Sequence, residues 1–184
     1  MKTLLITLAL ASTIVPQAAA DAAVISIGSS GARTCYLSAA MKRHDQLAIN
    51  ECSNALSLDA MVGADRVATY VNRGIMYLLA KNLAAATRDF DAALSLDPIQ
   101  PEAYLNKSVA LYNAGLGRDA MALATRALEL RTGKPALAYY VRALGHEDGG
   151  NLRAAYADLM RARDLEPKWA EPAEQLKRYR RATR

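Results

Sequence analysis

Apolar and small side chains recur along this chain in four short segments that resemble one another. They are SNALSLDA at 53–60, DAALSLDP at 91–98, TRALELRT at 125–132 and MRARDLEP at 160–167. The last three begin at residues 91, 125 and 160, so the repeat has a period of 34 to 35 residues. Self-similarity at this period is typical of stacked units made of two helices each, and it predicts an all-α fold.

Small and large residues hold fixed positions within each unit. With residue 67 as position 1, positions 4, 8, 11, 20, 24, 27 and 32 are Tyr70, Gly74, Tyr77, Ala86, Phe90, Ala93 and Pro98. The unit that starts at 101 has Tyr104, Ser108, Leu111, Ala120, Ala124, Ala127 and Thr132 there, and the unit that starts at 136 has Tyr139, Ala143, His146, Ala155, Leu159, Ala162 and Pro167. Antiparallel helices approach closely where both present small side chains, and a proline ends the second helix. Each unit is therefore predicted to be a closely packed helix hairpin.

This pattern of small residues with Tyr, Phe and Pro at fixed offsets resembles the tetratricopeptide repeat. The resemblance covers Gly31 to Pro167 and is close in the three units from residue 67 onward. The first unit departs from the pattern, because bulky Tyr36 stands at the close-approach position and Ala60 replaces the proline. The resemblance implies a right-handed superhelix of about four antiparallel helix hairpins, the first one irregular, with a C-terminal capping helix.

These features divide the chain into consecutive segments. We expect a signal peptide at 1–20, an N-terminal linker at 21–32, a degenerate hairpin at 33–60, a linker at 61–66, repeats at 67–100, 101–135 and 136–169, and a capping helix with a basic tail at 170–184. Leu176 and Tyr179 should face the last repeat. The short apolar stretch from Val24 to Ile27 is expected to lie as an extended strand against the first helix pair.

The first 20 residues have the layout of a secretory signal peptide. Lys2 supplies a positive charge, an apolar run follows from Thr3 to Val15, and Ala18 to Ala20 offers small residues for cleavage after Ala20. The run is shorter than the ~20 residues that span a bilayer, so no stable membrane anchor is expected. We predict a periplasmic or secreted protein, similar to the small periplasmic repeat proteins of Gram-negative bacteria.

The formal net charge of the whole chain is +5. Positive charge is concentrated at the C-terminal end, which contains Lys177, Arg178, Arg180, Arg181 and Arg184. Cations suit the C-terminal end of a helix dipole, so a solvated last helical turn is the simpler interpretation. A weak contact of this tail with anionic surfaces is the alternative. Because we expect export, we predict no nucleic-acid partner.

Residue patterns for catalysis or cofactor binding are sparse. The two histidines, His44 and His146, belong to different units, and no metal-ligand, nucleophile or phosphate-loop motif occurs in the sequence. GSSGA at 28–32 lacks the Lys-Ser/Thr pair of a nucleotide loop and is interpreted as a linker. We therefore expect a protein that is not an enzyme and that has no cofactor and no metal site.

One pattern of charges recurs between units. Arg73 and Asp89 hold positions 7 and 23 of the unit at 67–100, and Arg142 and Asp158 hold the same positions in the unit at 136–169. We predict an ion pair between the two helices of each of these hairpins. The unit between them has Lys107 opposite an apolar residue, so its own pair should be missing.

The tetratricopeptide resemblance implies a concave groove lined by the first helices of the units. The expected lining residues are Val71, Asn72, Ile75, Leu79, Leu105, Asn106, Val109, Tyr112, Leu137, Tyr140, Val141 and Leu144. Asn72 and Asn106 hold the same position in successive units, and an amide side chain can both donate to and accept from the backbone of an extended peptide. The alternative is that asparagine is simply common at this position. The apolar and aromatic lining favours a partly apolar peptide over a terminal carboxylate.

Both cysteines lie in the degenerate first unit, where a redox pair, half of a metal site and a structural staple are the alternatives. In the repeat register, Cys35 is position 7 on the first helix and Cys52 is position 24 on the second. These are nearly the places of the proposed ion pairs, so the sulfurs should face each other within the ~5.5 Å Cα separation of a disulfide. Export would supply an oxidising compartment. We predict a Cys35–Cys52 disulfide that holds the first hairpin together.

Together these features predict a protein–protein interaction module or scaffold that binds an extended, partly apolar peptide segment of a partner. Two alternatives stay open. One is an accessory subunit of an envelope enzyme or secretion complex, held by the groove or the basic tail. The other is a thiol-redox protein that uses Cys35 and Cys52.

Overall fold

The computed structural model describes residues 23–24, 30–58, 61 and 63–182, and the expected signal peptide at 1–20 lies outside them. The described residues form nine α-helices and no strand. The helices are α1 Ser30–Ala40, α2 Gln46–Leu58, α3 Gly63–Leu79, α4 Leu83–Leu96, α5 Pro101–Asn113, α6 Gly117–Glu129, α7 Pro135–Asp148, α8 Leu152–Leu165 and α9 Ala170–Ala182. The prediction of an all-α fold is confirmed.

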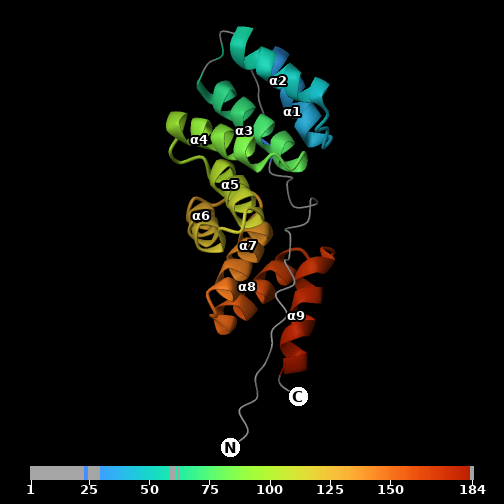
Figure 1. The fold of residues 1–184 in the computed structure, drawn as a ribbon, viewed down its shortest axis with the longest axis vertical. Helices are drawn as coiled ribbons and strands as arrows, with labels where there is room; N and C mark the ends of the chain where they lie inside the picture. The colour runs from blue at the N-terminus through green and yellow to red at the C-terminus, as the bar shows by residue number, and fades with distance from the viewer. Residues whose placement is uncertain (1–22, 25–29, 59–60, 62, 183–184) are drawn as a thin grey trace, which may run out of the picture.

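Consecutive helices pack in pairs, α1 with α2, α3 with α4, α5 with α6 and α7 with α8, and α9 packs on α8. The first helices of successive pairs also contact one another, α1 with α3, α3 with α5 and α5 with α7. Figure 1 shows the pairs following one another along the long axis, with α9 at the end opposite α1 and α2. Each pair is therefore supported mainly by its neighbours in the chain.

Small residues permit the close approach of paired helices. Gly74 on α3 faces the ring of Phe90 on α4, and a Cβ added at Gly74 would lie 2.5 Å from Phe90 Cε1. Ala86 and Ala93 on α4 are fully buried. A larger residue at position 74 would push the two helices apart, which is the physical reason for the small residue in the sequence pattern.

Side-chain caps and prolines mark several helix starts. Asn82 precedes α4, and its side chain accepts a hydrogen bond from the Ala85 N–H; Asn151 caps α8 in the same way. Pro101 and Pro135 are the first residues of α5 and α7, where the missing N–H breaks no helical hydrogen bond. Local sequence therefore fixes where these helices begin.

The linker expected at 61–66 is shorter than predicted, because α3 already begins at Gly63. Asp65 lies in the first turn of α3, where a carboxylate is favourable near the helix dipole. Arg66 donates a hydrogen bond from Nη2 to the Leu56 carbonyl oxygen on α2 at 2.9 Å. These contacts extend the helix toward the preceding hairpin.

Buried apolar side chains form one long core from α3 to α9 and a smaller core at the α1–α2 end. The smaller core consists of Cys35, Ala39, Ala48, Ile49, Cys52 and Met76. At the other end, Leu176 on α9 is buried and Tyr179 packs against the long core. The last helix therefore covers the final pair, with these two residues directed as the sequence predicts.

Candidate functional site

The side-chain amide of Asn72 on α3 holds the backbone of Val24 at two points. The Val24 N–H donates to Asn72 Oδ1 at 2.8 Å, and Asn72 Nδ2 donates to the Val24 carbonyl oxygen at 2.8 Å. Asn72 is fully buried. Both atoms of the amide thus bind one residue of a non-helical segment, using backbone groups that every residue except proline possesses.

The residues beside this contact are apolar. Ala23 and Val24 are partly buried and pack against the long core, and Ala23 also packs against the smaller core. The sequence predicted contact of 24–27 with the first helix pair, whereas Val24 bonds to α3 of the second pair; residues 25–29 lie outside the described residues. Asn72 thus joins Val24 to α3 of the second pair.

The other residues expected to line a groove lie on α3, α5 and α7. All of them except Tyr112 are buried: Val71, Ile75, Leu79, Leu105, Asn106, Val109, Leu137, Tyr140, Val141 and Leu144. Asn106 donates from Nδ2 to the Glu102 carbonyl oxygen of its own helix at 2.9 Å. In this structure these side chains do not line an open groove, and a partner would reach them only after the groups that cover them move.

Aromatic side chains gather where α7 meets the start of α9. The Tyr140 and Trp169 rings have their centroids 4.8 Å apart at an interplanar angle of 57°. Burial of the Tyr140 phenol raises its pKa to about 12, so it is neutral at physiological pH. At this end of the expected binding face, Tyr140 is therefore neutral and packs against a second aromatic ring.

Two ion pairs join the helices of the second and fourth pairs. Arg73 Nε and Nη2 donate to the Asp89 carboxylate, each at 2.8 Å, and Arg142 makes the same two bonds to Asp158 at 2.7 and 2.8 Å. Arg73 also donates from Nη1 to Ser53 Oγ on α2 at 3.0 Å. Both aspartates are 6% exposed. At positions 7 and 23 of these two units, residues 16 apart therefore meet across one hairpin.

These pairs affect the pKa of the arginines. Burial lowers the pKa of Arg73, but the hydrogen bonds and charge of Asp89 outweigh burial and raise it overall. For Arg142 the bond to Asp158 is the largest effect, and the pKa is likewise raised. Both arginines are therefore held in the charged state that the aspartates require.

The third pair of helices has a different bridge. Lys107 on α5 bonds to Asp91 on α4, so this bridge joins two neighbouring hairpins instead of the two helices of one hairpin. The Asp91 side chain is 53% exposed. The sequence predicted ion pairs within units only, whereas this bridge joins residues of two units that are also 16 positions apart.

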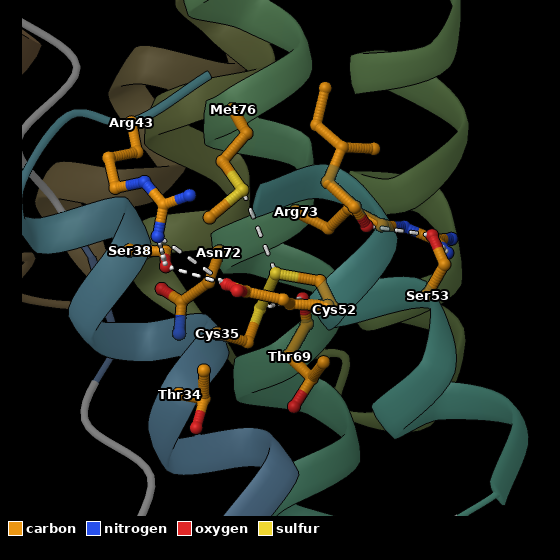
Figure 2. Close-up of a disulfide and its surroundings, with 12 residues drawn as sticks. Thr34, Cys35, Ser38, Arg43, Cys52, Ser53, Thr69, Asn72, Arg73 and Met76 are labelled. Carbon is orange, nitrogen blue, oxygen red and sulfur yellow. Dashed lines mark hydrogen bonds and ion pairs between the residues drawn. A yellow bond between two sulfur atoms is a disulfide. The ribbon is translucent and has the colours of Figure 1, made fainter. Parts of the chain in front are cut away.

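The two cysteines of the chain form a disulfide between α1 and α2, with Cα atoms 4.8 Å apart. Both residues are fully buried. Cys52 Sγ lies 3.6 Å from Met76 Sδ, and Cys35 Sγ lies 3.8 Å from the Thr69 carbonyl oxygen, so the bond also rests on α3. Figure 2 shows the disulfide within the first hairpin, with Thr69 and Met76 of α3 beside it. The predicted disulfide is confirmed.

Comparison with protein-family models and with curated proteins found no match to this chain. Among the described residues, no three His, Cys, Asp or Glu side chains are grouped so that they could hold a metal ion. No helix in the described part of the chain is long and apolar enough to cross a membrane.

Proposed function

We propose that this chain is an exported binding protein of the tetratricopeptide type, and that it holds an extended, partly apolar peptide of a protein partner. The 34-residue period (91 to 125) and the ordered contacts between first helices support this family, and the right-handed superhelix is part of the proposal. The observation that carries the peptide-binding proposal is the two-point contact of Asn72 with the Val24 backbone.

The chemistry of this contact suits recognition of an extended chain. An amide that donates to a backbone carbonyl and accepts from the N–H of the same residue replaces the two hydrogen bonds of a strand partner. Because it uses backbone atoms alone, it fixes the position of a peptide without demanding a particular sequence. Once the groups that cover them move, the apolar residues of α3, α5 and α7 would contact the side chains of the partner.

The disulfide supports export and a structural use of the cysteines. Disulfides persist in oxidising compartments, which agrees with the signal-like sequence at 1–20. Thiol exchange requires access to a sulfur, and both Cys35 and Cys52 are fully buried. We therefore propose that the bond stabilises the first hairpin and that the protein acts by binding in the cell envelope.

Site-specific photo-crosslinking tests the binding proposal. A benzophenone amino acid at Tyr112, a partly exposed residue of the face, should capture a specific partner in the envelope of cells that make the protein. Capture should be lost when Asn72→Ala is combined with Asn106→Ala. Asn54→Ala, on an exposed part of α2, is the matched control and should leave capture unchanged. Equal capture by the unsubstituted protein, the double variant and the control would show that the partner does not bind at this face.

A further inference from the structure

The residue that Asn72 binds belongs to the same chain. Val24 lies 48 positions before Asn72, and both of its backbone hydrogen-bonding groups are used in the contact. Ala23 and Val24 also contact the apolar cores. The amide that we assign to partner binding is thus already occupied, by an apolar residue that lies outside the helices.

We propose that Ala23 and Val24 form an intramolecular ligand of Asn72, and that a partner peptide binds by displacing them. This proposal rests on the peptide-binding function proposed above. The structural reason is that the Asn72 amide has one NH₂ group and one oxygen, and both are directed at the backbone of Val24. A second peptide cannot make the same two bonds while Val24 makes them.

The intramolecular ligand also indicates which partner fits. Backbone bonds fix its position, so selectivity must come from side chains in contact with the core. Those side chains are the small Ala23 and the β-branched Val24. The preferred partner is therefore an extended segment in which a small residue precedes a branched apolar residue, with no charge at either position.

The cost of displacement follows from competition. With Asn72 open in about 10% of molecules, the apparent dissociation constant of a free peptide is raised about tenfold. A partner must therefore bind more tightly, or be more concentrated, to displace Val24 from Asn72.

Val24→Pro in the otherwise intact chain removes the N–H that donates to Asn72 Oδ1 and leaves the helices untouched. Val24→Ala is the matched control, because it keeps both backbone groups. The probe is a fluorescein-labelled peptide DAAVISIG, which copies residues 21–28. Its dissociation constant is measured by fluorescence anisotropy. The Val24→Pro chain should bind the probe about tenfold more tightly than the native chain. The Val24→Ala chain should lie between the two, because it keeps both backbone groups and loses only part of the side-chain contact, and adding Asn72→Ala should abolish binding.

Four outcomes separate the inference from the function on which it rests. Equal probe affinity for the native and Val24→Pro chains overturns the intramolecular competition but leaves peptide binding intact. No binding to the Val24→Pro chain overturns both. A native dimer that becomes monomeric on Val24→Pro shows exchange of the segment between copies and also overturns the inference. A native monomer whose Val24 amide exchanges slowly by NMR, and rapidly once the probe is bound, supports it.

Discussion

The bond between Arg73 and Asp89 offers a quantitative test of how the second hairpin is held together. Arg73→Met keeps the aliphatic packing of the side chain but removes the guanidinium. Asp89→Asn removes the negative charge with little change of shape. The double-mutant cycle of these substitutions measures the coupling free energy between the two groups.

The magnitude follows from burial and from the remaining partners. Asp89 is 6% exposed, so Arg73→Met leaves a buried carboxylate without its cation and should lower the free energy of unfolding by about 3 kcal/mol. Asp89→Asn should cost less, about 2 kcal/mol, because Arg73 keeps its bond to Ser53 and its side chain is 17% exposed. The coupling free energy should be about 2 kcal/mol.

Urea unfolding followed by circular dichroism at 222 nm measures these free energies, with the disulfide kept oxidised in every variant. Lys107 and Asp91 provide the matched comparison, because their bridge spans the same sequence separation but includes an exposed carboxylate. Its coupling should be below about 1 kcal/mol and should fall with added salt. A coupling at Arg73–Asp89 no larger than that at Lys107–Asp91 would refute the argument from burial.

Three further changes test the packing. Replacing both cysteines, Cys35→Ala with Cys52→Ala, should lower the free energy of unfolding by about 3 kcal/mol, because the disulfide closes a separation of 17 residues. Amide hydrogen exchange should then become faster first in α1 and α2. An equal increase in all helices would contradict a disulfide that stabilises only the first hairpin. Gly74→Ala should lower the free energy of unfolding, measured with urea, by about 1–3 kcal/mol, because its Cβ would meet an aromatic ring on α4. Gly63→Ala, where an added Cβ has open space, should show no comparable loss. Asn82→Ala should lower the thermal midpoint through about 1 kcal/mol of lost capping, while an unchanged midpoint would show that the cap bond adds nothing.

The local parts of the fold were predictable because each depends on residues a short distance apart in sequence. The small residues predicted the close helix pairs, and the spacing of 16 predicted the Arg73–Asp89 and Arg142–Asp158 bonds. The repeat register also predicted the disulfide within the first hairpin. The repeat register placed the start of the second unit at residue 67, so it did not predict that α3 begins at Gly63 and includes Asp65 and Arg66.

Contacts between units were less predictable. Lys107 selects Asp91 from the preceding hairpin because that carboxylate lies within reach once α4 and α5 pack together. The expected groove residues are buried for a similar reason: their exposure depends on what the rest of the chain places against α3, α5 and α7. Neither property is encoded in the pattern of a single repeat.

By itself, the sequence determined the helical class of this protein, its helix pairs, the charge partners within hairpins and the pairing of its two cysteines. These features follow from helix periodicity and from side chains held at fixed offsets. Only the tertiary structure decided that Asn72 holds Val24, across 48 residues and a neighbouring hairpin. Contacts of that separation depend on how the stack places the N-terminal segment, and no local spacing rule specifies that placement.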